Sequence, residues 1–318
     1  MSSHWGLSSL VDMRVVFAGS PDVARIALDA LIEADIPLVG VISQPDRPVG
    51  RKKTITPTPV SIRARDAALD LFRPVTQAEL VDAVTTLQPD LVIVVAYGRL
   101  IGAEALEIPL HGWWNLHFSL LPSYRGATPV QHALLAGDRT TGVSVFQIDT
   151  GLDTGDVLGQ RPVAIEPFVT AGELLETLAH EGASLLVEVF HALEQGQLEA
   201  RAQHGEVSLA PKLPADAGRL DFHQSVADVF RRWQAVTPEP GAYTTLRDRE
   251  GRLVIRHARP APDVVDLSVG QLELRGSKVF VGCGRGALEL IRVHPSGKKE
   301  MSAADWARGL GHAVHCGQ

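Results

Sequence analysis

Cysteine is scarce in this chain, which holds only Cys283 and Cys316 among its 318 residues. Neither cysteine has a second one at the spacing that zinc sites use. Two cysteines are also too few for the disulfide framework that stabilises small secreted domains. We therefore expect both side chains to be free thiols in a reducing compartment.

Long apolar runs are missing as well. The longest uninterrupted one, Leu91 to Tyr97, is far shorter than the roughly 20 residues that a membrane-spanning helix needs. The N-terminus has no basic region followed by an apolar core, which a secretory signal would require. The sequence therefore predicts a soluble, cytoplasmic protein with no membrane partner.

Strand patterns alternate with helix patterns through residues 13–204. The first strand is followed by a turn at Gly19 that lacks the three glycines of a dinucleotide-binding loop, so no dinucleotide cofactor is expected. The alternation predicts an α/β fold with a Rossmann-like parallel sheet and helices on both faces. Residues 1–12 are polar and patternless, and we expect them to be disordered or an extension of the start. Strands are predicted at 14–19, 38–42, 90–97, 113–117 and 142–148, and helices near 23–34, 60–70, 76–87 and 170–195.

The pattern changes after residue 204. Residues 205–218 are polar and spaced by Gly and Pro, which predicts a linker. Residues 219–318 combine a helix with several short strands, which predicts a small β-barrel of the OB type. The formal charge is −10 in residues 1–204 and +3 in residues 205–318. This asymmetry favours a C-terminal surface that meets a polyanion, with an ordinary solvated face as the alternative.

The densest cluster of functional side chains lies at 115–127. Asn115 and His117 are two residues apart on a predicted strand, so both side chains leave the same face. Ligands in open parallel sheets bind at the carboxyl ends of the strands, where this cluster is expected. An amide and an imidazole held side by side can both donate to one developing oxyanion, which suits acyl transfer. A purely structural pair on a strand is the alternative.

A second cluster follows the predicted strand at 142–148. Its loop holds Asp149, Asp153 and Asp156 together with two glycines. An aspartate beside His117 would favour the charged imidazolium, so we expect a raised pKa for His117. A turn capped by aspartates is one alternative; a metal loop is less well supported, because the spacing does not match a calcium loop.

The third cluster is basic and lies between Gln44 and Pro59. Arg47, Arg51, Lys52 and Lys53 are interleaved with Gly and Pro, which predicts a mobile loop that could bind phosphates. A solvated surface loop would have the same composition.

Taken in this order, the three clusters resemble those of the folate-dependent formyltransferases, over about residues 13–310. Segment 115–127 is similar to the family's catalytic strand and loop, and segment 142–156 to its second signature. The resemblance implies transfer of a formyl group from 10-formyltetrahydrofolate without a metal. It implies catalytic positions for Asn115, His117 and Asp153. It also implies folate contacts for two stretches, Ser119, Leu120, Leu121 and Pro122, and Val95, Ala96, Tyr97 and Gly98.

The catalytic residues do not indicate which molecule accepts the formyl group, so the acceptor has to be inferred from other residues. The loop with Arg47, Arg51, Lys52 and Lys53 resembles the insertion with which the tRNA-formylating members hold the acceptor end. Residues 293–301 resemble the C-terminal barrel of the same members. The resemblance therefore implies that the partners are folate and initiator methionyl-tRNA, bound by a monomer.

The sequence departs from the family pattern at two places. Ser123 stands where a basic residue is frequent, which puts one folate or phosphate contact in doubt, and residues 237–242 replace a more aromatic turn.

Two other functions stay open. A formyltransferase that acts on the amine of a sugar nucleotide shares the same catalytic residues. An RNA-binding protein with a vestigial folate site would keep the linker, the barrel and the basic loop.

Overall fold

The computed structural model describes residues 13–49, 53–247, 249–310 and 314–317. The expected extension at residues 1–12 lies outside this part of the chain, and so do Arg51 and Lys52 of the basic loop. The chain forms two compact units. The N-terminal unit comprises Met1–Gly126, Thr140–Ala164 and Leu175–Leu209, and the C-terminal unit comprises Ala127–Arg139, Ile165–Leu174 and Ala210–Gln318. Because the units do not divide the chain at one point, the linker at 205–218 stays a prediction.

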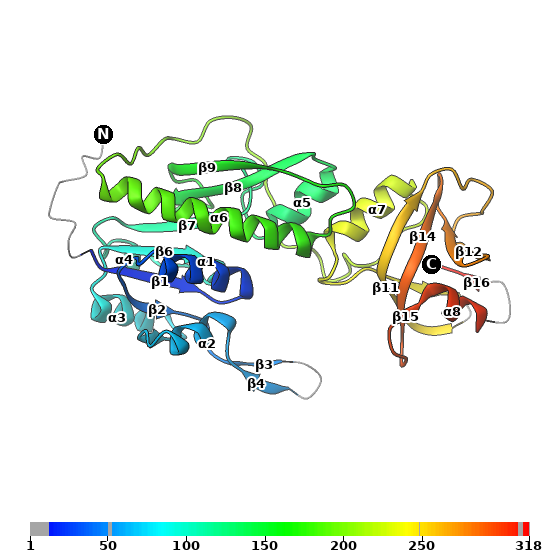
Figure 1. Cartoon of the computed structure of the whole chain (residues 1–318), viewed down its shortest axis with the longest axis horizontal. Helices are drawn as coiled ribbons and strands as arrows, with labels where there is room; N and C mark the ends of the chain where they lie inside the picture. The colour runs from blue at the N-terminus through cyan, green and yellow to red at the C-terminus, as the bar shows by residue number, and fades with distance from the viewer. Residues whose placement is uncertain (1–12, 50–52, 248, 311–313, 318) are drawn as a thin grey trace. The chain divides into compact units, whose positions relative to one another are not determined.

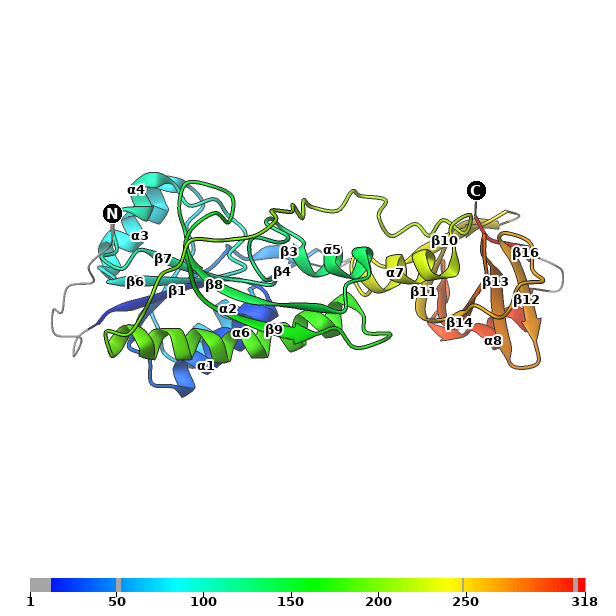
Figure 2. The same ribbon diagram turned by 90° about the horizontal axis from the view of Figure 1, so that it is seen from above.

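The N-terminal unit is built on a seven-stranded sheet with the order β5-β2-β1-β6-β7-β8-β9. Its centre is β6, whose five apolar residues are all buried, as expected for a strand that is covered on both faces. Figures 1 and 2 show α1 and α6 over one face and α3 and α4 over the other. The strands are β1 (Val15–Gly19), β2 (Leu38–Ile42), β5 (Leu71–Phe72), β6 (Leu91–Val95), β7 (Trp113–His117), β8 (Thr140–Gln147) and β9 (Val157–Ala164). The helices are α1 (Asp22–Glu33), α2 (Pro59–Asp66), α3 (Gln77–Leu87), α4 (Ala103–Leu106) and α6 (Ala171–Glu194).

The strands β5, β2, β1, β6 and β7 are all parallel, as the sequence predicts. β8 is antiparallel to both of its neighbours, β7 and β9. Gln147, at the carboxyl end of β8, therefore lies opposite Trp114 near the beginning of β7. The sequence pattern misses this reversal because periodicity reports which residues are buried and not the direction in which strands pair. The acidic loop that follows β8 consequently does not share a carboxyl edge with His117 and must fold back to reach it.

The basic segment is a hairpin where a loop was expected. β3 (Arg47–Val49) and β4 (Thr54–Thr56) pair as antiparallel strands, with Arg47 opposite Thr56 and Pro48 opposite Ile55. The prediction of a loop is therefore wrong for these residues. Gly and Pro suggested a loop, but a two-stranded edge tolerates Pro, and Thr and Ile favour strands.

The C-terminal unit is a nearly closed antiparallel barrel. Its strands follow the order β10-β11-β14-β13-β12-β16, and β15 pairs with β14. Hydrogen bonds from Gly317 N to the Thr245 carbonyl (2.9 Å) and from Arg247 N to the His315 carbonyl (3.0 Å) join the two outer strands. The strands are β10 (Tyr243–Leu246), β11 (Arg249–Ala261), β12 (Gln271–Arg275), β13 (Lys278–Gly282), β14 (Ala287–Pro295), β15 (Met301–Ser302) and β16 (Val314–His315), and the helices are α5 (Pro129–Ala136), α7 (Val226–Ala235) and α8 (Ala303–Arg308).

Both cysteines lie in this unit and are buried, and desolvation raises the pKa of each thiol to about 12. None of the helices in the described ranges is both long enough and apolar enough to cross a membrane.

Trp233 of α7 anchors the core of the barrel. Its ring stacks on Phe230 at 5.3 Å between centroids, and its indole N–H donates to the Ile255 carbonyl (3.0 Å). Only 2% of the residue is exposed, so truncation removes many contacts and leaves a buried carbonyl without its donor.

We predict that Trp233→Ala destabilises the C-terminal unit by about 3–5 kcal/mol, the usual cost of deleting a large buried aromatic side chain. Urea unfolding followed by circular dichroism measures the loss. Val265→Ala is the control, because Val265 is 73% exposed and its truncation should change little. Equal effects of the two substitutions would show that Trp233 does not hold this core.

Candidate active site

Asn115 and His117 lie on β7, on the face of the sheet opposite to α6. Leu116, between them, points to the other face and packs where Gly182 of α6 leaves room. His117 is 5% exposed, whereas Asn115 is half-buried. Among the described residues the Asn115 amide has no hydrogen-bond partner, so it is available to a ligand.

Two oxygens of other segments face the two ring nitrogens of His117. Nε2 lies 2.9 Å from the Tyr124 carbonyl, and because a carbonyl only accepts, Nε2 carries a proton. Nδ1 lies 3.8 Å from Oδ2 of Asp153, which is too long for a hydrogen bond but close enough for strong attraction once the ring is charged. The neutral ring therefore presents an unprotonated Nδ1 toward a carboxylate, which prepares it to accept a proton there.

Burial lowers the pKa of His117 below its ordinary value, and this effect outweighs the raising effects of Asp153 and the Tyr124 carbonyl. The expectation of a raised pKa is therefore wrong. The sequence identified the attraction by Asp153 correctly but could not reveal how deeply the imidazole is buried. His117 is consequently neutral near pH 7 in the free protein.

Asp153 is placed by its backbone and by Gly126. Its φ angle of 51° lies in the left-handed region, which a residue other than glycine adopts only when the surroundings hold it there. The Gly126 N–H donates to Oδ2 of Asp153 (2.7 Å). The carboxylate is thus held by the loop that follows β7.

The loop at 148–156 is shaped by Asp149 and Gly155. Asp149 Oδ1 accepts from Gly151 N (2.9 Å) and from the Thr154 hydroxyl (2.6 Å), so Asp149 caps the turn. A Cβ at Gly155 would lie 1.7 Å from the Gln147 carbonyl, so only glycine fits. Within the described ranges no group of three or more His, Cys, Asp or Glu side chains could hold a metal ion.

The first stretch that the resemblance assigns to folate is packed against β8. Ser144 Oγ donates to the Ser119 carbonyl (2.6 Å) and accepts from Leu121 N (3.1 Å). Ser119, Leu121 and Pro122 are buried, and only Leu120 is partly exposed. Any contact of this stretch with a ligand would involve mainly its backbone.

The second stretch, 95–98, divides into core and surface. Val95 and Tyr97 are buried, and Tyr97 belongs to the core between the sheet, α3 and α4. Ala96 and Gly98 are exposed and have φ angles of 46° and 78°. Ala96 and Gly98 are therefore the members that can line a site.

The described part of the basic hairpin is connected to this stretch through Gln44. The Gln44 side-chain N–H donates to the Tyr97 carbonyl (2.9 Å), and its Oε1 accepts from Arg47 (2.5 Å) and Arg99 (3.2 Å). Lys53 is exposed in the turn before β4.

Sequence comparison identifies relatives of both units. A family profile described as formyl transferase matches residues 13–190, and one described as the formyl transferase C-terminal domain matches residues 212–311. The chain is 48% identical over 298 residues to the methionyl-tRNA formyltransferase of Arthrobacter sp. (strain FB24), covering 93% of this chain and 97% of the relative. The chain belongs to the formyl transferase family. Several relatives of 44–48% identity are named methionyl-tRNA formyltransferase, which confirms the resemblance found in the sequence.

Solved structures of other proteins share the fold. HypX from Aquifex aeolicus in complex with tetrahydrofolic acid superimposes with a TM-score of 0.67 at 20% identity, covering 94% of this chain and 47% of HypX. This chain thus spans about half the length of HypX. An N-formyltransferase from Helicobacter canadensis, in complex with folinic acid and dTDP-3-aminofucose, has a TM-score of 0.67 at 16% identity over 89% of this chain and all of its own. These likenesses confirm the α/β unit followed by a barrel.

Sequence reasoning missed several residues that hold the site of this formyl transferase. Tyr124 and Gly126 lie in the first motif, but nothing in it indicates that their backbone atoms bind His117 and Asp153. Gln203 and Ser208 contact the same loops, as described below, from about 50 to 90 residues farther along the chain. No local pattern could have found them, because their partners are distant in sequence.

The buried, neutral His117 makes folding sensitive to acid. The unfolded chain protonates this side chain below its ordinary pKa of about 6.5, whereas the folded chain does so only at lower pH, so stability falls as the pH drops below about 6.5. We predict that His117→Gln, which cannot titrate, loses less stability between pH 7.5 and 5.5 than the wild type does. Urea unfolding at the two pH values measures this difference.

The control for the acid effect is His180→Gln, since His180 is exposed on α6. This variant should keep the pH dependence of the wild type. The same slope in all three proteins would show that His117 does not titrate as its burial requires.

Proposed function

We propose that this chain transfers a formyl group from 10-formyltetrahydrofolate to the amino group of methionine on initiator tRNA. The observation that carries the proposal is the buried imidazole of His117 with the partly exposed carboxylate of Asp153 at 3.8 Å, beside the available amide of Asn115 on the same face of β7. The relatives named methionyl-tRNA formyltransferase support the acceptor, and the tetrahydrofolic acid bound by HypX supports the class of donor.

In the proposed reaction, the neutral amine attacks the formyl carbon, and the carbonyl oxygen becomes an oxyanion. The Asn115 amide donates to this oxygen, a contribution that is typically worth about 10²–10³ in rate. When the intermediate collapses, the bond between the formyl carbon and the folate nitrogen breaks. That nitrogen then takes up the proton that the amine has lost. No covalent bond to the enzyme is needed.

His117 is proposed to carry the proton between the two nitrogens. Its lowered pKa keeps it neutral before the reaction, and its unprotonated Nδ1 faces Asp153. After Nδ1 accepts the amine's proton, the imidazolium is stabilised by the Asp153 carboxylate and by the developing oxyanion. Asp153 therefore acts on the charged form of His117, and its effect grows as the reaction proceeds.

The acceptor end of the tRNA is proposed to lie against the β3–β4 hairpin. Arg47 begins β3 opposite Thr56, and Lys53 lies in the turn before β4. The remaining two basic residues of the cluster, Arg51 and Lys52, lie outside the described residues. The folate contacts of 95–98 and 119–122 stay part of the proposal, as does action as a cytoplasmic monomer. The two buried thiols suit a reducing compartment.

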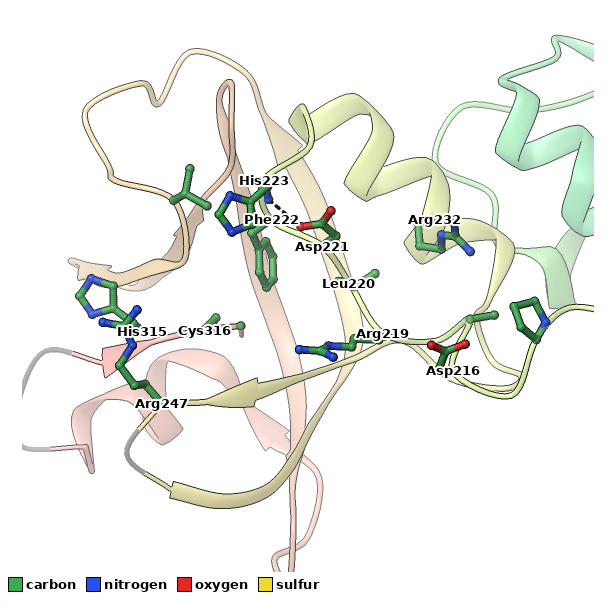
Figure 3. A pocket seen from close by; sticks show the side chains of 14 residues that line it. Asp216, Arg219, Leu220, Asp221, Phe222, His223, Arg232, Arg247, His315 and Cys316 are labelled. Carbon is green, nitrogen blue, oxygen red and sulfur yellow. Dashed lines mark hydrogen bonds between the residues drawn. The ribbon is translucent and has the colours of Figure 1, made fainter.

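The barrel offers a second cationic surface. A cavity of about 550 Å³ lies within the C-terminal unit, and Figure 3 shows Arg219 and Arg247 extending toward it. His223, His315 and Arg232 also line it. Two carboxylates, Asp216 and Asp221, line it as well. Asp221 accepts hydrogen bonds from His223 N (3.0 Å) and from the Gln224 side chain (3.1 Å). We propose that this cavity receives phosphates of the tRNA backbone.

We predict that Asn115→Ala, His117→Ala and Asp153→Ala each lower kcat by at least about 10², with little change in folding. Because the three side chains would act on one intermediate, the losses should be far from additive. Single-turnover assays with charged initiator tRNA measure them, with a nucleotide-linked amino sugar offered as the competing acceptor. Near-normal turnover of His117→Ala, or preference for the sugar, would contradict the proposal.

We predict that Arg219→Gln combined with Arg247→Gln weakens tRNA binding and reduces the slope of log K against log salt by about 1–2, as expected for one or two lost phosphate contacts. Fluorescence titration at several salt concentrations measures the slope. The matched control is Arg259→Gln with Arg308→Gln, which are exposed arginines of the same unit outside the cavity. Equal slopes for both double variants would rule out the cavity as the phosphate site.

A further inference from the structure

Residues 201–209, which follow α6, contact both loops of the active site, and we call them the bridging segment. Arg201 and Val157 exchange two backbone hydrogen bonds of 2.8 and 2.9 Å beside the acidic loop. At the other end of the segment, Ser208 accepts from Tyr124 N through its hydroxyl (2.8 Å) and from Arg125 N through its carbonyl (2.9 Å). The segment therefore joins two loops that do not follow each other in the chain.

Gln203 lies between these two attachments in the sequence, and its side-chain amide makes four hydrogen bonds. Its Oε1 accepts from Nε (3.2 Å) and Nη2 (2.7 Å) of Arg125. Its Nε2 donates to the carbonyls of Asp153 and Gly155, both at 2.8 Å. A glutamine side chain has two donor hydrogens and one oxygen with two lone pairs, so every hydrogen-bonding position of this amide is occupied.

The contacts of Gln203 complete a ring of interactions around the His117–Asp153 pair. The Tyr124 carbonyl holds His117, and the Gly126 N–H holds Asp153. Arg125 is the residue between Tyr124 and Gly126 in the sequence. Gln203 holds Arg125 on one side and the backbone of Asp153 on the other. The left-handed backbone of Asp153 requires such outside support, because its conformation is unfavourable in isolation.

We propose that Gln203, supported by Ser208, is a positioning residue that sets the distance between Asp153 and His117. It contacts neither ring nor carboxylate directly, and it acts through the backbone of Asp153 and through Arg125. This inference rests on the proposed function. It explains how Asp153 Oδ2 stays 3.8 Å from His117 Nδ1 although no direct hydrogen bond joins the two side chains.

Two substitutions at Gln203 distinguish its role in positioning Asp153 from its hydrogen bonds to Arg125. Gln203→Glu keeps an acceptor for Arg125 and adds an ion pair, but it replaces the donor by an oxygen that faces two carbonyls. Gln203→Ala removes both contacts. If Gln203 positions Asp153, both variants should lower kcat by about 10–10², as expected for a displacement of the order of 1 Å, while KM for the tRNA stays near the wild-type value.

Ser208 provides a rescue test. Ser208→Ala should lower kcat in the same direction as Gln203→Ala, and Ser208→Thr, which keeps the hydroxyl acceptor for Tyr124 N, should restore it. The matched control is Gln234→Glu, because Gln234 also donates an amide hydrogen to a carbonyl, that of Val169 (2.8 Å), but in the C-terminal unit. This control should change stability alone.

Two decisive outcomes concern Asp153, and the second of them can be read without substrate. On an Asp153→Asn background, Gln203→Ala should cost little further activity, since the distance it sets no longer matters. Histidine NMR of the free protein should show the pKa of His117 falling further in Gln203→Ala, because Asp153 is the charged side chain in the described chain that raises it. An unchanged His117 titration, or full activity of Gln203→Glu, would overturn the inference.

Failure of the positioning role can be told apart from failure of the proposed function. If the wild type does not formylate methionyl-tRNA, the proposed function is wrong, yet the NMR titration still tests whether Gln203 controls the His117–Asp153 pair. Should either variant fail to fold, Ser208→Thr against Ser208→Ala gives the same comparison with a smaller change of volume.

Discussion

The burial of an imidazole beside a carboxylate is the constraint on which the site depends. Taking His117 out of water disfavours its charge, and in the described part of the chain Asp153 and the Tyr124 carbonyl oppose this cost. Both oxygens belong to loops, not to the sheet that carries His117. The sheet can therefore fix only His117. The positions of the Asp153 carboxylate and the Tyr124 carbonyl have to come from hydrogen bonds made by the loops.

Much of the fold follows from local patterns. The five buried apolar residues of β6 and the apolar residues of α1 at helical spacing are set by neighbours within one element, so periodicity finds them. The direction of β8 is different, because it depends on which way β8 pairs with β7, and periodicity does not report that. The β3–β4 hairpin was missed for a related reason: Pro48 and Gly50 are typical of loops, and only the pairing partner shows that the flanking residues are strands.

The candidate site was predictable in its chemical groups but not in its electrostatics. Asn115, His117 and Asp153 could be named from their motifs, since each motif is a continuous run of the sequence. The sign of the His117 pKa shift could not, because it depends on how much water the fold removes from the ring. Gln203 gave no signal, since its three partners are Arg125, Asp153 and Gly155, from 48 to 78 residues earlier in the chain.

The acidic loop explains why such distant support is needed. Its course is set locally by Asp149, which caps the turn, and by Gly155, where a side chain would collide with the Gln147 carbonyl. These features bend the loop back from the far end of β8, but they leave Asp153 in an unfavourable backbone conformation at the tip. A residue in that state relaxes unless other segments hold its peptide groups. Gly126 holds the carboxylate and Gln203 the carbonyl, so the position of the charge that acts on His117 is fixed from both sides.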